Sequence, residues 1–422
     1  MIKSEKRRLF LSWWLAAIVF SLPTYLIRFK IGGIPTTFLE VNLYIFFLVY
    51  FLFFWWPNRS ALLHQYRGKV GNLIWPALLI FLGAVIGVAV SPDRRAALGL
   101  FKAYFLDPFL FTFAALSLLR SFQDISRIIW AMGLSVGVIG AVAIFQWLGF
   151  VPSPEPWISE TPKRVTSLFE YPNAVSLYCL PPTGIFIGLL LFGKKKSIWW
   201  RVIILLIILL GFAAIYLAVS RGALIALLLV SFVAGLFSPY KKWVFVAVLA
   251  VILLLIGSLP MRERIAALSS RQDYSTISRI EFWRASGEMI KTDWLTGVGL
   301  SGFSPAYQTL AREKDYRQDL NLIYPHNIFL NFWVTLGVFG FVGFLWALVA
   351  FFFSVKRIIS HSKVAKAPAK GLLIAMAMLV LHGLVDVPYL KNDLSLQFWT
   401  ILIIPYLLVL IQKRADDAAS SK

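Results

Sequence analysis

Cysteine, acidic residues and metal-binding motifs are all scarce in this chain. The single cysteine, Cys179, excludes an internal disulfide and any metal site built from several thiolates. No Asp-x-Asp triplet or His-Glu-x-x-His motif occurs, so the carboxylate pairs typical of divalent-metal transferases and the signature of zinc hydrolases are both missing. Charged residues make up only 14% of the sequence, against about 25% in a soluble domain. These absences argue against an ordinary soluble metalloenzyme.

Long apolar stretches take the place of the missing charge, because 59% of the residues are hydrophobic and the mean hydropathy is +0.77. Stretches of about 20 apolar residues are long enough to cross a bilayer core of about 30 Å, whereas a membrane β-barrel shows short alternating segments. We therefore predict an all-α polytopic membrane protein, a single integral membrane domain over 1–422 with about 12 transmembrane helices. The predicted spans are 10–27, 38–56, 72–90, 98–119, 128–150, 174–192, 198–219, 223–237, 243–259, 327–353, 371–386 and 394–412.

Basic residues outnumber acidic ones, 41 to 20, which gives a net charge of +21. In a soluble protein this excess would suggest nucleic acid, but here membrane lipid covers most of the surface and the cations gather in short loops, where they set topology. We therefore expect no nucleic-acid partner. Placing the basic N-terminus in the cytoplasm puts most cationic loops and the C-terminus there too. The outer segments are then 151–173, 220–222, 386–393 and one large, partly helical loop, 260–325.

Arg221 is the first candidate for chemistry, because it lies between two apolar spans with no acid nearby. A charge at membrane depth is costly and usually functional. Gly222 beside it would let another group approach closely. The alternative is an arginine whose charged end reaches the lipid headgroups while its stem stays apolar.

Arg279 is the second candidate and lies in the large outer loop. Ser278 and Glu281 match a capping box, which predicts that a helix starts there with Arg279 in its first turn and Arg284 further along. A helix N-terminus attracts anions, and arginine can bind a phosphate through two hydrogen bonds. The alternative is a pair of surface charges on an amphipathic helix at the membrane interface.

His326 is the third candidate, since it stands with Asn327 at the start of a long apolar span. An imidazole at the outer mouth of a helix can titrate near working pH and act as a general base on a hydroxyl. The alternative is a histidine that only caps the helix or lies at the interface. Another histidine, His382, lies within a span, and Asp386 four residues later is its candidate partner.

Five short motifs, in this order, resemble the O-antigen ligase and polymerase family of bacterial membrane glycosyltransferases. They cover the region from about 160 to 350, which we take as the ligase-like core. The glycine motif among them is a weak phosphate signature and is better interpreted as tight turns. The motifs are RVTSLFEYPN (164–173), SRGA (220–223), SRIEFW (278–283), GVGLSGF (297–303) and PHNIFL (325–330).

The resemblance implies an enzyme of the bacterial plasma membrane, with its active site facing the periplasm and with no metal or other cofactor. Its donor would be a glycan on a polyprenyl diphosphate, and its acceptor a hydroxyl group. The essential family positions match Arg221, Arg279 and His326. Four further residues are candidates for binding the diphosphate or the glycan: Arg284, which is the alternative to Arg279, Arg164, Asn173 and Asn327.

Several functions stay open at this point. A ligase passes the glycan to lipid A core, a polymerase passes it to another lipid-linked repeat unit, and a related branch uses protein hydroxyls. We favour the ligase, because the outer loop is single and moderate in size. A transporter or lipid flippase would suit the number of spans, with Lys102 and Asp107 as an intramembrane pair, but the hydropathy shows no two-fold repeat. A non-catalytic scaffold that docks partners on the aromatic-rich loop is a further alternative.

Overall fold

The structure, a computed structural model, describes residues 2–66, 71–160, 162–194, 197–257, 274–316, 324–362 and 364–420. Helices dominate these residues, which confirms the all-α class, and the one sheet among them is an antiparallel hairpin of β1 (Arg28–Ile31) and β2 (Ile34–Thr37). The α-helices are α1 (Ile2–Phe20), α2 (Phe38–Tyr50), α3 (Trp56–Tyr66), α4 (Gly71–Val90), α5 (Arg94–Phe101), α6 (Asp107–Leu118), α7 (Phe122–Trp147), α8 (Pro172–Phe192), α9 (Ile198–Leu217), α10 (Arg221–Leu236), α11 (Lys241–Gly257), α13 (Tyr274–Asp293), α14 (Phe303–Lys314), α15 (Ile328–His361), α16 (Lys366–His382) and α17 (Asn392–Ser420).

Eight helical stretches within the described ranges are long and apolar enough to cross a membrane, so the chain is a multi-pass membrane protein. The other four predicted spans coincide with α1, α10, α11 and α16. Of these, α10, α11 and α16 have only 16, 17 and 17 residues, and α1 begins with a run of charged residues. The prediction of twelve spans therefore stays a prediction. The eight stretches are Phe38–Ser60, Leu73–Val90, Arg94–Leu118, Phe122–Trp147, Pro172–Phe192, Ile198–Leu217, Ile328–His361 and Asn392–Arg414.

The fourth predicted span contains a π-helical turn, Lys102–Leu106, between α5 and α6. The two charges beside it do not pair with each other. Lys102 Nζ lies 3.1 Å from a carboxylate oxygen of Glu40, and the hydroxyl of Tyr44 donates to Asp107 at 3.2 Å. Both partners come from α2, so these charges join α2 to the fourth span, and the intramembrane pair of the transporter hypothesis is not formed.

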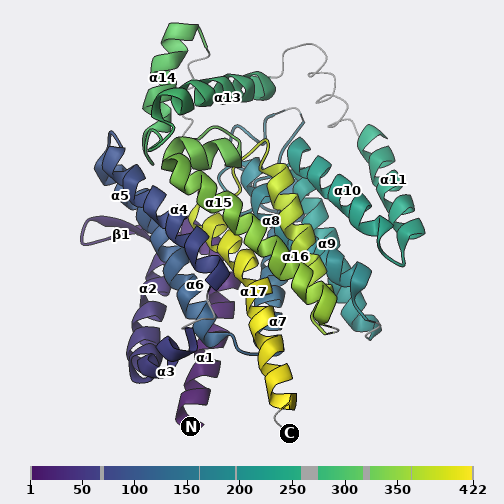
Figure 1. The fold of residues 1–422 in the computed structure, drawn as a ribbon. Coiled ribbons are helices and arrows are strands. Elements are labelled where there is room, and N and C mark those ends of the chain that lie inside the picture. The colour runs from purple at the N-terminus through teal and green to yellow at the C-terminus, as the bar shows by residue number, and fades with distance from the viewer. Residues whose placement is uncertain are drawn as a thin grey trace.

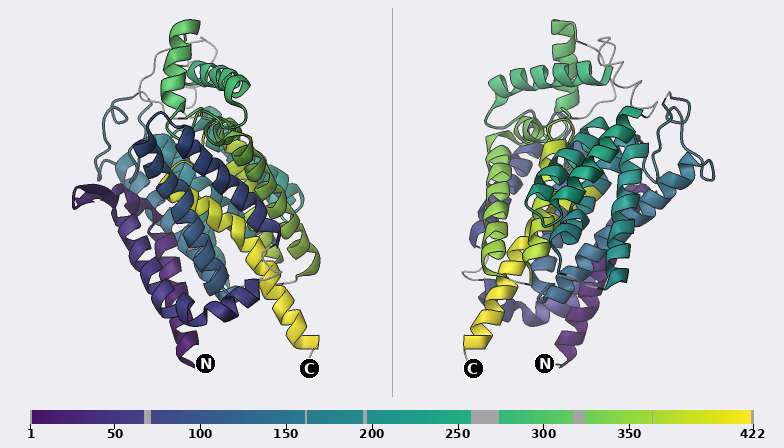
Figure 2. Two further views of the ribbon diagram at one scale, coloured as in Figure 1. Left: turned by 60° about the vertical axis from the view of Figure 1, so that its left-hand side comes forward. Right: turned by 90° about the vertical axis from the view of Figure 1, so that its right-hand side faces the viewer.

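The helices form a bundle with two distinct ends (Figure 1). Both chain termini lie at one end, here called the terminal end, and α13 and α14 lie across the opposite end, here called the loop end (Figure 2). Within the bundle α8 packs on α16 and α4 packs on α15. The most enclosed spans are α8 and α17, because 83% of each apolar window is buried. The described part of the predicted large loop thus forms a separate helical layer on the bundle.

The GVGLSGF segment, which connects α13 to α14, is inserted between α4 and α15. Gly297 and Gly299 have φ angles of +68° and +89°, a region that side chains with a Cβ rarely adopt. A Cβ on Gly299 would also lie 2.8 Å from the carbonyl oxygen of Gly87 in α4, and one on Gly297 would collide with the carbonyl of Val334 in α15. These glycines therefore allow a tight turn between two helices, as the sequence indicated.

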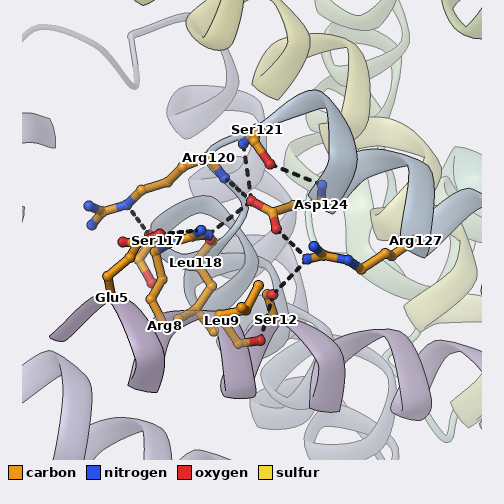
Figure 3. Close-up of polar contacts among 10 residues, drawn as sticks. All are labelled: Glu5, Arg8, Leu9, Ser12, Ser117, Leu118, Arg120, Ser121, Asp124 and Arg127. Carbon is orange, nitrogen blue, oxygen red and sulfur yellow. Dashed lines mark hydrogen bonds and ion pairs between the residues drawn. The ribbon is translucent and has the colours of Figure 1, made fainter. Parts of the chain in front are cut away.

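A cluster of charged residues ties α1 to α6 and α7 at the terminal end (Figure 3). Asp124 in the first turn of α7 is only 1% exposed and accepts hydrogen bonds from Arg8 at 2.9 Å and Arg127 at 2.7 Å. It also closes a capping box with Ser121. Arg8, itself 7% exposed, donates to the carbonyl of Leu118 at the end of α6. This Asp124 cluster is thus a buried, well-connected joint between three helices.

Candidate active site

The connection 383–391, between α16 and α17, brings distant parts of the chain together at the loop end. The carbonyl of Leu384 accepts a hydrogen bond from Asn327 Nδ2 at 3.0 Å, and that of Val385 accepts one from Arg279 Nε at 2.8 Å. The carbonyl of Gly383, the residue before them, accepts a hydrogen bond from the amide of Ile328, the first residue of α15, at 2.7 Å. Three successive carbonyls therefore fix α13 and the start of α15 against this connection.

His326 forms a hydrogen bond with Asp386, which follows those three carbonyls. Its Nδ1 lies 3.1 Å from Asp386 Oδ1, and the two side chains are 16% and 3% exposed. Burial alone would raise the pKa of the Asp386 carboxyl, but the charge and hydrogen bond of His326, with His382 and Arg279 nearby, hold it well below its usual range. An ionised carboxylate accepts hydrogen bonds only, so it fixes the proton of the neutral imidazole on Nδ1 and leaves Nε2 as the basic atom.

The RVTSLFEYPN segment, whose role the sequence did not reveal, supports the same carboxylate. Asn173 Nδ2 donates to Asp386 Oδ2 at 3.3 Å, and Arg164 donates to Asn173 Oδ1 at 2.9 Å. Arg164 Nε also donates to the carbonyl of Ala218 at 3.0 Å, just after α9. The predicted residues Arg164, Asn173 and His326 are therefore linked through Asp386 in one hydrogen-bonded chain.

Arg221 is the first residue of α10 and is half-buried. The neighbouring Gly222 shows where this turn lies, because a Cβ there would be 2.6 Å from Val385 Cγ2 and 3.3 Å from His382 Cδ2. The close approach that the sequence suggested for Gly222 is thus made, and it is made to the connection 383–391. Gly222, the neighbour of Arg221, and Arg279 therefore both approach Val385.

The predicted capping box at Ser278 and Glu281 is wrong, because α13 already begins at Tyr274. Ser278 is 4% exposed and shares a buried stripe with Phe282, which is 1% exposed. These positions are four residues apart and so lie on one face of the helix. Packing of this stripe continues the helix through the point where the local motif would start it.

The structure distinguishes the two loop arginines. Arg279 is half-buried and bonded to Val385, whereas Arg284 is exposed on α13. Asn327 has a clear structural task, because its Oδ1 accepts from the amides of Phe329 and Leu330 and it is the N-cap of α15. Whether Arg284 or Asn327 binds substrate stays a prediction.

Unusual backbone angles gather around these segments. His326, Val219 and Ser167 have φ angles of +49°, +53° and +50°, and they make up three of the four non-glycine residues with positive φ in the described ranges. Such a conformation costs on the order of 1–3 kcal/mol and tends to occur at functional sites. It is most unusual for a β-branched residue, and Val219 stands two positions before Arg221.

A cavity of about 520 Å³ opens beside His326. Of the three predicted catalytic residues only His326 lines it, and Arg164 and Asn173 line it as well. Nowhere in the described ranges do three or more His, Cys, Asp or Glu residues gather in a way that could hold a metal ion. The other lining residues are mostly aromatic or basic: Tyr25, Arg28, Tyr104, Trp157, Glu170, Tyr171, Pro172, Tyr324, Leu390, Lys391 and Asn392.

Asp386 is the residue that the sequence placed wrongly. Its candidate partner was His382, four residues earlier, but α16 ends at His382 and the carboxylate binds His326 instead. An i,i+4 pair requires both residues to lie on one helix, and the helix stops too early. The available signal was an aspartate just beyond an apolar span at the predicted outer face.

Comparison with known families gives one match, in which residues 204–345 correspond to the O-antigen ligase family. The matched region contains Arg221, Arg279 and His326, lies within the predicted core 160–350, and ends before Asp386. No curated protein matches the chain. The family match confirms the resemblance that the motifs indicated, and the chain therefore carries an O-antigen ligase family domain over residues 204–345.

Proposed function

We propose that this protein is a membrane glycosyltransferase that moves a glycan from a polyprenyl diphosphate to an acceptor hydroxyl, with lipid A core as the acceptor. The family match supports a membrane enzyme of the ligase or polymerase type. The observation that carries the reaction is the His326–Asp386 pair at a cavity. Arg279 of α13 bonds the connection 383–391 that carries Asp386, and Gly222, next to Arg221 in α10, closely approaches the same connection.

In this reaction His326 is the general base. Its Nε2 removes the proton of the acceptor hydroxyl as that oxygen attacks the anomeric carbon, and the bond from that carbon to the diphosphate oxygen breaks. The proton stays on the imidazole, and the bonding electron pair leaves with the diphosphate. Asp386 holds the ring in place and stabilises the imidazolium that forms, as the carboxylate does in a catalytic triad. Attack opposite the leaving group inverts the anomeric carbon.

The two arginines act on the leaving group. Negative charge develops on the diphosphate as the bond breaks, and guanidinium groups held close to it stabilise that charge. Arg221 stands in the first turn of α10, where the helix N-terminus also favours an anion. Arg279 is oriented by its bond to Val385. We propose that these positive groups replace a divalent metal ion.

The proposed site faces the periplasm of a bacterium, in the plasma membrane, with both termini in the cytoplasm. The arrangement of the chain supports this proposal, because the termini share one end of the bundle and the site lies at the other (Figure 1). The distribution of lysine and arginine along the sequence gives the same orientation.

The test uses purified protein, a polyprenyl-diphosphate oligosaccharide and EDTA, with or without lipid A core. Glycan transferred to lipid A core, with inversion at the linking carbon, supports the ligase proposal. Longer lipid-linked glycans formed without lipid A core would identify a polymerase instead. A folded protein that transfers nothing under either condition would overturn the proposal, and activity that EDTA abolishes would overturn its metal-independent form.

A further inference from the structure

Aromatic and basic side chains line most of the cavity beside His326. Five aromatic residues, Tyr25, Tyr104, Trp157, Tyr171 and Tyr324, share its lining with the basic residues Arg28, Arg164 and Lys391. Aromatic side chains offer flat apolar faces and, in Tyr and Trp, a polar edge. Apolar walls with a few convergent polar groups are typical of sites for small organic ligands. The composition therefore suits a ligand with flat apolar faces, many hydroxyls and negative charge.

Two of the three basic side chains already have an acidic neighbour. Arg28 pairs with Glu170 at 3.0 Å. Arg164 lies 3.8 Å from Glu160 and also bonds Asn173. Most of their charge is thus matched within the protein itself.

Lys391 differs from these two arginines. Its Nζ lies 4.1 Å from the ring centre of Tyr171 and 3.4 Å from the hydroxyl of Tyr25, and no carboxylate of the described residues comes within 4.0 Å of it. Burial lowers the pKa of Lys391, although Asp393 and Glu170 oppose the change. An ammonium that has lost water without gaining a carboxylate is stabilised by an anionic ligand.

The backbone around Lys391 is held by hydrogen bonds on both sides. The Lys391 amide donates to the carbonyl of Tyr389 at 2.8 Å, and its own carbonyl accepts from Ser395 in the first turn of α17 at 2.9 Å. Tyr389 is completely buried and its hydroxyl donates to the carbonyl of Tyr104. The lysine therefore stands on a fixed segment, as a residue that selects a ligand requires.

A second cavity extends the first. It has a volume of about 400 Å³ and shares Arg28 and Asn392 with the cavity beside His326. Lys30 and Lys102 line it, next to the β1–β2 hairpin, together with Glu40, which pairs with Lys102. Lys30 thus adds a basic side chain next to the cavity beside His326.

We propose that the cavity beside His326 is the subsite for the acceptor, that it takes an acidic saccharide, and that Lys391 binds the negative charge. The inference rests on the proposed function, in which His326 removes the acceptor proton while Arg221 and Arg279, which do not line this cavity, bind the donor diphosphate. The acidic group is a sugar carboxylate or a sugar phosphate, since an ammonium recognises both.

The test measures binding to the purified full-length protein in detergent by titration calorimetry. The probes are trigalacturonic acid, a phosphorylated mannose oligosaccharide and neutral maltotriose. Wild type should bind an acidic probe at least about tenfold more tightly than maltotriose. Lys391→Met should remove about tenfold of that affinity, the change expected for one charge-assisted hydrogen bond, and Lys391→Arg should retain it. The probe that binds more tightly identifies carboxylate or phosphate as the recognised group.

Lys314→Met is the matched control, because Lys314 is an exposed lysine of α14 at the same end of the molecule and does not line the cavity. Its affinities should equal those of wild type, and thermal midpoints check that each variant is folded. Equal binding of acidic and neutral probes, no binding of either acidic probe, or an unchanged Lys391→Met variant would overturn the inference. Acid-selective binding without glycan transfer would support the acidic subsite and overturn the proposed function. Glycan transfer without acid-selective binding would support the proposed function and overturn the acidic subsite.

Discussion

Asp124 and Asp386 are both buried carboxylates close to a helix end, one at each end of the bundle, and both accept several hydrogen bonds. Asp124 accepts hydrogen bonds from two arginines, forms a capping box with Ser121, and is 1% exposed. Asp386 binds a histidine and an asparagine, and that histidine lines a cavity. Arginine keeps its charge at every physiological pH, whereas histidine can lose and regain a proton.

The comparison shows which feature separates a structural carboxylate from one that can serve catalysis. Both carboxylates are buried and both accept several hydrogen bonds, so these two properties do not separate a structural carboxylate from a catalytic one. The deciding features are a partner that exchanges protons and the access of that partner to a substrate-sized space.

The largest effect is expected at the loop end from His326→Ala. Loss of a general base lowers the rate by about 10²–10⁴-fold, so glycan transfer should fall by that factor. The thermal midpoint should fall as well, since the change leaves Asp386, whose side chain is 3% exposed, without its imidazole partner. Rates are measured with equal amounts of folded protein. A variant that retains more than about a tenth of the wild-type rate would contradict the assignment of the base.

At the terminal end, Asp124→Ala should act on stability instead. The change leaves Arg8, which is 7% exposed, as a buried charge without this carboxylate, and breaking such a pair costs about 3–5 kcal/mol. Denaturant unfolding in detergent measures the free energy of unfolding. A matched variant, Lys314→Ala on exposed α14, should cost less than about 0.5 kcal/mol. An Asp124→Ala protein as stable as this control would show that the Asp124 cluster is not a structural joint.

The two arginines of α13 provide a third comparison. Arg279→Ala should lower the transfer rate by about 10²–10³-fold, the usual cost of removing one group that stabilises developing negative charge. Arg284→Ala should change the rate by less than about twofold, because the Arg284 side chain is exposed on α13 and a solvated guanidinium stabilises developing charge only weakly. Parallel rate measurements on the two variants decide this, and equal losses would place Arg284 in the site as well.

The smallest effect is expected from Asn327. Asn327→Ala removes the N-cap of α15 and should cost about 1 kcal/mol of stability, whereas Asn327→Ser keeps a capping oxygen and should cost less. Both variants should transfer glycan at nearly the wild-type rate once the amount of folded protein is matched. If Asn327→Ser is stable but loses most of its activity, Asn327 binds substrate as the sequence suggested.

Composition and local motifs were enough to predict the membrane class and the three residues on which the proposed reaction depends. A charged residue among apolar ones, such as Arg221, is visible in the sequence. These features need no knowledge of tertiary contacts. The same holds for Gly297 and Gly299, whose turn was expected from residue type alone.

The partnership at the centre of the site was not predictable in the same way. His326 and Asp386 are 60 residues apart, and Asn173 and Asp386 are 213 apart. The nearer partner, His382, was favoured because sequence spacing assumes a continuing helix. The start of α13 was missed for a related reason, since the buried stripe through Ser278 and Phe282 depends on tertiary packing.

The most direct test of this account compares Asp386→Asn with Asp124→Asn in one transfer assay, with each rate expressed per folded molecule. We predict that Asp386→Asn loses about 10²-fold or more, because the imidazole loses the carboxylate that orients it and stabilises its charge. We predict that Asp124→Asn stays within about twofold of wild type despite its lower stability, because Asp124 lies outside the site. Equal losses in the two variants, or full activity in Asp386→Asn, would contradict the central claim that only the carboxylate at the loop end serves the reaction.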